Sequence, residues 1–130
     1  KIQKICQKYQ HKFIIGKDRQ LAKRLRADGV HFSDRDRTIS TKKLKNLIYS
    51  LSCHHLNSVK KAKNADLLFF SPIFTTNSHP QALPQGLAQL KKAQNLSSKP
   101  IFALGGINIK NITKILKVYY HFILCHFISY

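Results

Sequence analysis

Methionine is absent from this 130-residue sequence, so the chain lacks a translational start and we expect further sequence upstream of Lys1. The N-terminus lacks the order of charged, apolar and small residues that marks a signal peptide, which predicts a cytoplasmic protein. The three cysteines are widely spaced and form no CxxC pair, which argues against zinc or redox chemistry and predicts buried thiols. The apolar C-terminal run is about half as long as the ~20 residues that cross a bilayer, so no membrane partner is expected.

Acidic residues are also scarce, with five aspartates and no glutamate against 23 lysines and arginines. The resulting formal net charge of +18 predicts attraction to phosphates, nucleic acid and anionic surfaces at low salt. Most of the lysines fall at positions typical of an exposed helix surface, where solvated charge needs no partner. The charge therefore leaves open both a basic binding module and an ordinary cationic surface.

Short apolar runs alternate along the chain with amphipathic segments of helical period. The runs predict six strands, at Phe13–Ile15, Gly29–Phe32, Leu47–Ser52, Leu67–Ile73, Ile101–Leu104 and Phe122–Ile128. The amphipathic segments predict five helices, at Asp18–Arg26, Thr41–Leu47, Leu56–Lys63, Gly86–Leu96 and Asn108–Val118. Strands that alternate with helices form parallel sheets, so residues 1–130 are expected to make a single α/β domain. A doubly wound sheet and part of an eight-stranded barrel both fit this order, and a complete barrel takes about 250 residues.

Two segments repeat the same βα pattern, since KRLRADGVHF and KKAKNADLLFF each run from a basic helix end through Ala-Asp into an apolar strand. The repeated aspartates are Asp28 and Asp66. Helix starts are expected where a side chain can accept a first-turn amide proton, at Asp18, Ser40 or Thr41, Asn57 and Asn108.

Ligands of parallel α/β folds gather at the carboxyl ends of the strands. Three of the five acids, Asp18, Asp34 and Asp36, follow the first two predicted strands. Carboxylates that converge there predict a Mg²⁺ site that would bridge to substrate phosphates. The alternative is that Asp18 caps a helix while Asp34 and Asp36 lie on a solvated turn.

The Gly105-Gly106 pair follows a predicted strand and precedes a predicted helix, a position suited to holding a phosphate. The alternative is a tight turn that needs glycine for backbone reasons alone. Cys53 beside His54 suggests a nucleophile and its base, but neighbouring strand residues point to opposite faces, which argues against the pair. His31 alternates with apolar residues, and we interpret it as an ordinary strand residue.

Four segments, taken together, resemble the thiamine phosphate synthase and thiazole tautomerase (TenI-like) superfamily over residues 10 to 115. They are ADGVHF with its acidic turn, LSCHHLNSVKKA, ADLLFFSPIFTTNSHP and PIFALGGINIKNI. The resemblance implies an incomplete (β/α)8 TIM barrel in which this chain supplies strands 3 to 8 and strands 1 and 2 are absent. It also implies the coupling of a hydroxymethylpyrimidine diphosphate with a thiazole phosphate, with release of pyrophosphate and with Mg²⁺ stabilising the leaving group.

The resemblance also implies roles for individual residues. They are Asp18 and Asp36 for magnesium, Ser52 and His79 for catalysis, and Thr75, Thr76, Gly105, Gly106 and Ser129 for substrate and phosphate binding. The family usually has a lysine where His79 stands and an asparagine where Lys17 stands. The tautomerase branch needs a histidine where this chain has Pro72, which favours the synthase branch.

Three interpretations of function follow. The first is a thiamine phosphate synthase-like transferase of thiamine biosynthesis, which binds phosphorylated thiazole and pyrimidine molecules and depends on strands supplied elsewhere. The second is a basic polyanion- or nucleic-acid-binding module, although no groove-reading motif supports a specific nucleic acid, and the third is a nonfunctional gene remnant. Two absent strands would leave exposed sheet edges, so homo-oligomers are expected.

Overall fold

The computed structural model describes residues 1–36, 43–78 and 80–118, and its strands form one parallel sheet. The strands are β1 (Ile14–Gly16), β2 (Gly29–Phe32), β3 (Ile48–Cys53), β4 (Leu67–Phe70) and β5 (Ile101–Ala103). The helices are α1 (Ile2–Lys8), α2 (Arg19–Arg24), α3 (Leu56–Lys61), α4 (Gly86–Leu96) and α5 (Ile112–Val118).

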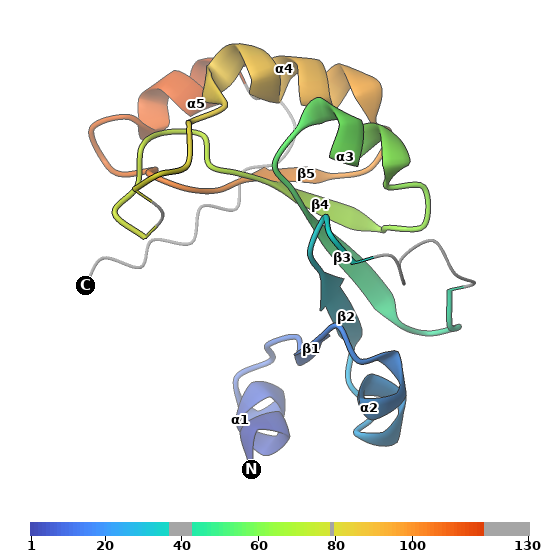
Figure 1. Ribbon diagram of the computed structural model, residues 1–130. Helices are drawn as coiled ribbons and strands as arrows, with labels where there is room; N and C mark the ends of the chain where they lie inside the picture. The colour runs from blue at the N-terminus through green and yellow to red at the C-terminus, as the bar shows by residue number, and fades with distance from the viewer. Residues whose placement is uncertain (37–42, 79, 119–130) are drawn as a thin grey trace.

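The strand order in the sheet is the order of the chain, β1-β2-β3-β4-β5. A doubly wound sheet reverses direction at a switch point, whereas a barrel adds each new strand to the same edge. Figure 1 shows the strands as a twisted sheet, with α3, α4 and α5 grouped over one face of that sheet. The chain therefore has an α/β fold that is like part of a TIM barrel, as the sequence predicts in outline.

Alternate residues of each strand form the core beneath the helices, because successive strand side chains point to opposite faces. The buried apolar side chains of β2 to β5 are Val30, Phe32, Tyr49, Leu51, Cys53, Leu68, Phe70, Ile101 and Ala103. The helices contribute Ala22, Val59, Leu90, Ala93 and Ile115 to the same core. The other face of the sheet carries His31, Ser52, Phe69 and Phe102, which are only half-buried.

The repeated Ala-Asp pattern has a structural basis in both copies. Asp28 Oδ2 accepts a hydrogen bond from Phe13 N at 2.8 Å, and Asp28 N donates to Phe13 O. Asp66 Oδ2 accepts from Tyr49 N at 2.7 Å, and Asp66 N donates to Tyr49 O. Each aspartate thus ties the start of its own strand to the strand before it, and the repeat is confirmed.

Four of the predicted strands agree with β1, β2, β3 and β5 to within one residue at each end. The predicted strand Leu67–Ile73 is too long, because β4 ends at Phe70. Pro72 follows two residues later and has no N–H with which to continue the ladder. The predicted strand Phe122–Ile128 lies outside the described residues.

The predicted helix Gly86–Leu96 is confirmed, and those at Asp18–Arg26 and Leu56–Lys63 are confirmed in shortened form as α2 and α3. The predicted helix Thr41–Leu47 is wrong within residues 43–47, which form a turn before β3. Asn46 has φ of 64°, a left-handed conformation that a right-handed helix does not contain. The helix α1 was not among the helices predicted from periodicity.

Two predicted helix starts are wrong, and the one at Ser40 or Thr41 lies outside the described residues. His55 precedes α3, so Asn57 lies inside the helix. α5 begins at Ile112, four residues after Asn108. Asn108 Oδ1 accepts from Lys110 N at 2.9 Å and Asn111 Oδ1 accepts from Asn108 N at 2.8 Å, and these local bonds hold a turn in place of a first helical turn.

Among the helices of the described residues, none has the length and apolar character needed to cross a membrane.

Candidate active site

The connection from β1 to α2 places two charged residues at the carboxyl end of the sheet. Lys17 N donates to the His31 carbonyl at 2.8 Å, and Lys17 adopts φ of 62°. Asp18 Oδ1 accepts from Leu21 N at 2.8 Å and caps α2, which confirms the prediction of a helix start there. This bond occupies one carboxylate oxygen of Asp18, and the carboxylate has a second oxygen for another partner.

The turn after β2 holds Asp36 in a fixed position. Its Oδ2 accepts from Ser33 N at 2.6 Å and from Ser33 Oγ at 2.8 Å, and Lys17 Nζ lies 3.7 Å from Oδ1. Partial burial raises the pKa of Asp36, but the hydrogen bonds from Ser33 and the Lys17 charge outweigh it and hold that pKa below its ordinary value. The carboxylate is therefore ionised at neutral pH, the state that a metal ligand requires.

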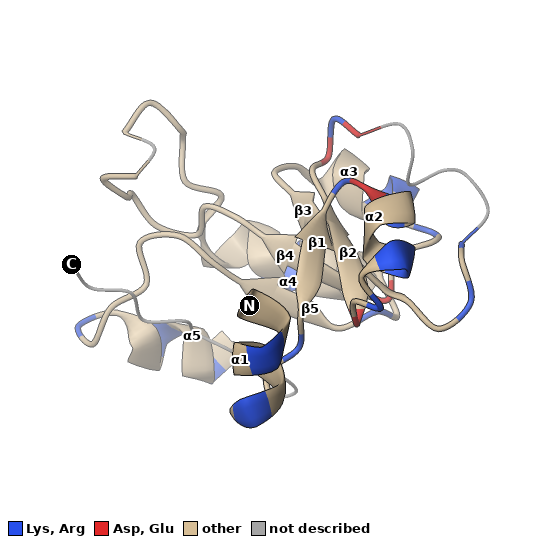
Figure 2. Ribbon diagram, turned by 90° about the horizontal axis from the view of Figure 1, so that it is seen from below, with Lys and Arg blue, Asp and Glu red and all other residues tan. Residues whose placement is uncertain are grey.

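The aspartates at this end of the sheet gather in one region. Figure 2 shows the acidic segments at the start of α2 and in the turn after β2 on the same side of the sheet. Asp34, in that turn, accepts a hydrogen bond from Ser58 Oγ of α3 at 3.4 Å. Within residues 1–36, 43–78 and 80–118, no three His, Cys, Asp or Glu side chains lie close enough to hold a metal ion.

The parallel register of β2 and β3 places an imidazole between two serine hydroxyls. His31 Nδ1 lies 2.9 Å from Ser50 Oγ, and His31 Nε2 lies 2.9 Å from Ser52 Oγ. The Phe69 ring meets the imidazole edge-on, with 5.6 Å between centroids. Burial lowers the pKa of His31, and the opposing effect of the Asp36 charge is smaller, so the imidazole is neutral at pH 7.

The contacts of His31 with Ser50 and Ser52 were not predicted from the sequence, in which His31 is interpreted as an ordinary strand residue. The sequence does show that His31 lies on the face opposite Val30 and Phe32, because strand side chains alternate. The pairing of His31 with Ser50 depends on the register between strands, which periodicity alone does not give.

The connection from β4 to α4 lies against the glycine turn after β5. Ile73 N donates to Leu104 O at 2.8 Å, and Phe74 N donates to Gly105 O at 3.0 Å. A methyl group on Gly106 would overlap the Thr75 carbonyl oxygen. The structure therefore brings Thr75 beside the predicted phosphate turn.

The same contacts explain the two glycines without any ligand. Gly105 and Gly106 have φ of 87° and 68°, which side-chain-bearing residues rarely adopt. A Cβ atom on Gly105 would lie 2.7 Å from Pro72 Cα. The backbone alternative for this pair is thus confirmed, and phosphate binding stays a prediction. Thr76 follows in the same loop, where its Oγ1 accepts from Ser78 N at 3.4 Å.

Cys53 is the last residue of β3, so His54 lies beyond the strand and the expected alternation does not apply to this pair. Cys53 is fully buried, and burial together with the Asp34 charge raises the pKa of its thiol to about 12. His54 Nδ1 is 2.8 Å from the Ser71 carbonyl oxygen, to which it donates. Cys53 is therefore confirmed as a buried thiol, and Cys6 is half-buried. His79, Ser129 and Cys125 lie outside the described residues.

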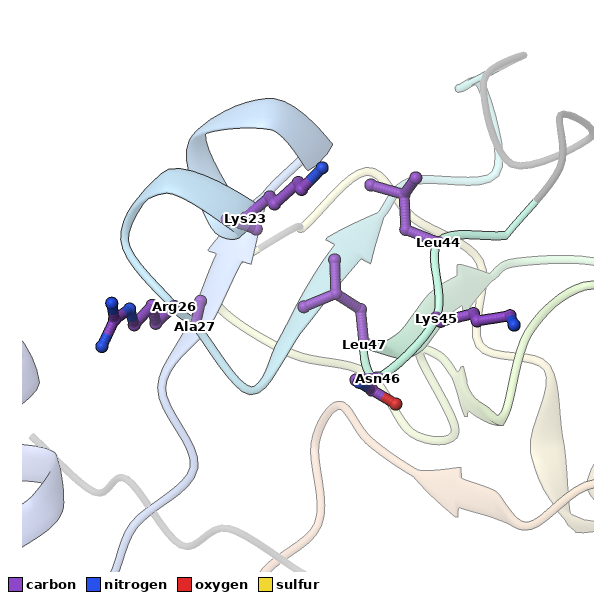
Figure 3. Close-up of a pocket in the computed structure, with 8 residues that line it drawn as sticks. Lys23, Arg26, Ala27, Leu44, Lys45, Asn46 and Leu47 are labelled. Carbon is purple, nitrogen blue, oxygen red and sulfur yellow. The ribbon is translucent and has the colours of Figure 1, made fainter.

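A cavity of about 450 Å³ lies at the other end of the sheet, between α2 and the turn before β3 (Figure 3). Ala27 and Leu47, which immediately precede β2 and β3, form part of its lining. In Figure 3 the Arg26 and Lys45 side chains point in opposite directions, away from the space between them. The cavity is separate from the aspartates and the His31 cluster, which lie towards the carboxyl ends of the strands.

The residues at the carboxyl ends of β1, β2 and β3 supply carboxylates, a hydroxyl and a neutral imidazole, while the glycine turn lies after β5. The sequence pattern of the thiamine monophosphate synthase family matches residues 1–125. The chain belongs to this family. The resemblance identified in the sequence is therefore confirmed.

Relatives and solved structures agree with this membership of the thiamine monophosphate synthase family. The chain is 40% identical over 121 residues to the thiamine-phosphate synthase of Pelagibacter ubique, covering 89% of this chain and 58% of that protein. It is 38% identical over 122 residues to the thiamine-phosphate synthase of Latilactobacillus sakei, covering 88% and 54%. The structure of thiamine phosphate pyrophosphorylase from Pyrococcus furiosus superposes with a TM-score of 0.75 at 29% identity, covering 90% and 58%. The chain thus spans a little over half the length of these thiamine monophosphate synthase family members.

Proposed function

We propose that this chain is the larger part of a thiamine phosphate synthase, a transferase of thiamine biosynthesis. The proposed reaction couples a hydroxymethylpyrimidine diphosphate with a thiazole phosphate and releases pyrophosphate. Its five described strands and the segment Phe122–Ile128 would be strands 3 to 8 of a (β/α)8 barrel, so that residues 1–130 form one partial domain. Activity would require the first two barrel strands.

The observation that carries this proposal is the gathering of Asp18, Asp36 and Ser52 at the carboxyl ends of three adjacent strands. Parallel barrels bind their ligands at this end of the sheet. In the proposed site Ser52 contacts the diphosphate, while Thr75, Thr76, Gly105, Gly106 and Ser129 bind the thiazole phosphate. His79 would take the place of the usual lysine beside the diphosphate.

The residues present fit a magnesium ion that shares its coordination with the substrate. Mg²⁺ is typically held by one or two carboxylates plus phosphate oxygens and water, so a set of three protein ligands is not needed. Asp18 and Asp36 would hold it. When bound, the ion would stabilise the negative charge on the leaving pyrophosphate.

The experiment is to measure thiamine phosphate formation from the two substrates with MgCl2, using the 130-residue chain and its complete reading frame. We expect product from the complete protein, and a loss of at least about 10-fold in Asp36→Ala, because losing even a group that only supports a metal ligand typically costs about 10- to 100-fold. Asp66→Asn is the matched control, since it changes an aspartate at the opposite end of the sheet and should keep the activity per folded molecule. No product from the complete protein, or equal losses in both variants, would contradict the proposal.

The alternatives give different results in the same samples. A polyanion-binding module predicts affinity for unrelated polyanions that falls linearly with the logarithm of salt concentration. Lys and Arg occur on helices as separate as α1, α2 and α5 (Figure 2), and this wide distribution does not favour such a module. A gene remnant predicts an interrupted reading frame upstream of Lys1.

The association state and the cellular location are part of the proposal. Within the described residues, β1 and β5 each pair with a strand on one side only. In the 130-residue chain without the first two barrel strands, the edge at β1 would favour pairing with another chain, so we expect homo-oligomers of this chain, which sedimentation would detect. We also propose a cytoplasmic location.

A further inference from the structure

His31 touches two hydroxyl groups with its two ring nitrogens, and this geometry restricts the direction of both hydrogen bonds. A neutral imidazole has one N–H donor and one acceptor nitrogen. One serine must therefore accept from His31 while the other donates to it. In the Nδ1–H tautomer Ser50 accepts and Ser52 donates, and in the Nε2–H tautomer Ser50 donates and Ser52 accepts.

The surroundings of Ser50 select a direction in the absence of a ligand. Ser50 is buried, and its Oγ donates to the Val30 carbonyl at 3.5 Å. With its own hydrogen used in this way, Ser50 Oγ accepts from His31 Nδ1–H. His31 Nε2 is then the acceptor for the Ser52 hydroxyl, so the Ser52 hydrogen points to the imidazole. The distance to the Val30 carbonyl is at the long limit for a hydrogen bond. Little hydrogen-bond energy is therefore lost if Ser50 turns its hydrogen from Val30 to His31 Nδ1.

We propose that His31 and Ser50 are positioning residues. They let the Ser52 hydroxyl hydrogen turn from the imidazole towards a phosphate-bearing ligand when that ligand reaches Ser52. Ionised phosphate oxygens accept hydrogen bonds, so a contact with Ser52 needs the serine to donate outward. His31 then carries its proton on Nε2 and donates to Ser52 Oγ, while Ser50 donates to Nδ1. The imidazole releases one proton from Nδ1 to solvent and takes one up at Nε2, so its charge does not change.

The cluster is built to hold this arrangement. The ladder between β2 and β3 pairs His31 with Ser50, and strand alternation puts Ser52 on the same face. Phe69 packs edge-on against the imidazole ring. The inference rests on the proposed function in one respect, namely that Ser52 contacts the diphosphate.

The direct test is nitrogen NMR of the ¹⁵N-histidine-labelled chain titrated with inorganic pyrophosphate and MgCl2. The His31 resonances are assigned by their loss in His31→Asn. We expect an Nδ1–H tautomer in the free chain and an Nε2–H tautomer at saturation, whereas a merely structural histidine would keep one tautomer. An unchanged tautomer on saturation overturns the proposal, and so does a failure of pyrophosphate to bind, because the proposal requires an anion site at Ser52.

A second test uses two substitutions that each keep one nitrogen position. The amide of His31→Gln reaches the Nε2 position and can still donate to Ser52, whereas that of His31→Asn reaches only the Nδ1 position. Pyrophosphate binding measured by calorimetry should weaken about 3- to 10-fold in His31→Asn and in Ser52→Ala, the range expected for one hydrogen bond. It should stay within about 2-fold of the unchanged chain in His31→Gln, with thermal unfolding confirming that each variant folds.

The outcomes separate this inference from the proposed function. If Ser52→Ala weakens binding but His31→Gln and His31→Asn lose affinity equally, the positioning role fails and the proposed function stands. If the tautomer changes on binding but the complete protein makes no thiamine phosphate, the proposed function fails and the role of His31 at a phosphate site stands.

Discussion

Lys17 and Asp36 form an ion pair across the carboxyl ends of β1 and β2, with 3.7 Å between Nζ and Oδ1. The lysine side chain is largely exposed, while that of Asp36 is 18% exposed. The proposed magnesium carboxylate therefore already has a cation beside it. The thiamine phosphate synthases that the sequence resembles usually have an uncharged asparagine at the position of Lys17.

Replacing Lys17 with asparagine should strengthen magnesium binding. The ammonium and the metal ion compete for the same carboxylate, and an exposed ion pair is worth about 0.2–1 kcal/mol, so the gain should be at most about 5-fold. Asparagine also tolerates the left-handed backbone at this position better than lysine does. Calorimetric titration with MgCl2 measures the change in affinity.

Lys12→Gln is the matched control for Lys17→Asn. Lys12 also pairs with an aspartate, Asp28, at 3.2 Å, but at the opposite end of the sheet. We expect no change in magnesium affinity in this control. An equal gain in both variants would show that only the overall charge matters and would contradict a specific competition at Asp36.

Three glycine substitutions should separate backbone strain from steric overlap. Gly106→Ala has both a positive φ and an overlap with the Thr75 carbonyl, and should cost at least about 2–3 kcal/mol of unfolding free energy. Gly86→Ala has φ of 72° but open space, and should cost about 1–2 kcal/mol. Gly16→Ala has open space and no positive φ, and should change stability by less than about 0.5 kcal/mol. Urea unfolding gives the order, and a loss in Gly106→Ala no larger than in Gly86→Ala would contradict the overlap.

Stability should fall in acid through two aspartates. The hydrogen bond from Phe13 N, together with Lys12, lowers the pKa of Asp28 below 3.8 despite some desolvation, and the pKa of Asp36 is also lowered. Because these native pKa values lie below the unfolded ones, the stability they contribute is fully present above pH 3.8 and is lost as pH falls through the native values. Asp28→Asn should therefore show a smaller drop in thermal midpoint between pH 5 and pH 2 than the unchanged chain. Equal drops in the two proteins would rule out this role for Asp28.

The cysteines should differ in reactivity. The thiolate is the reactive form, and a buried thiol with a pKa of about 12 has very little of it at pH 8. Iodoacetamide should therefore label the half-buried Cys6 well before Cys53 in the folded chain. Peptide mapping measures both sites in one sample, with urea-unfolded chain as the control in which Cys53 reacts. Labelling of Cys53 at the rate of Cys6 in the folded state would contradict the burial.

The strands were the most predictable part of the fold, because runs such as LLFF and IFAL are apolar over lengths that suit buried strands. The cap at Asp18 was also predictable, since its side chain acts within one helical turn. The turn at Lys45 and Asn46 was not, because a seven-residue segment of helical period gives too little signal to outweigh one left-handed residue. At Asn108, side-chain bonds to the local backbone replaced a helical turn that the pattern alone favoured.

The candidate site could be predicted only where it depends on position along the chain. Asp36 follows β2 and Ser52 ends the apolar run that predicts β3, so their place at the carboxyl end is readable from the sequence. The contacts of His31 with Ser50 and Ser52 depend on how two strands align, and the close approach of Thr75 to Gly106 depends on how two loops meet. Both relations join residues distant in the sequence, which local patterns do not connect.

The strand order β1-β2-β3-β4-β5 also bears on how a protein of this kind can change in length. Because each strand pairs with its neighbours in the chain, a cut near either end removes strands from an edge and leaves the remaining ladder continuous. A sheet with crossed strand order would instead lose an interior strand and split. Genes that encode such a fold can therefore be shortened or extended at their ends while the encoded sheet stays in one piece.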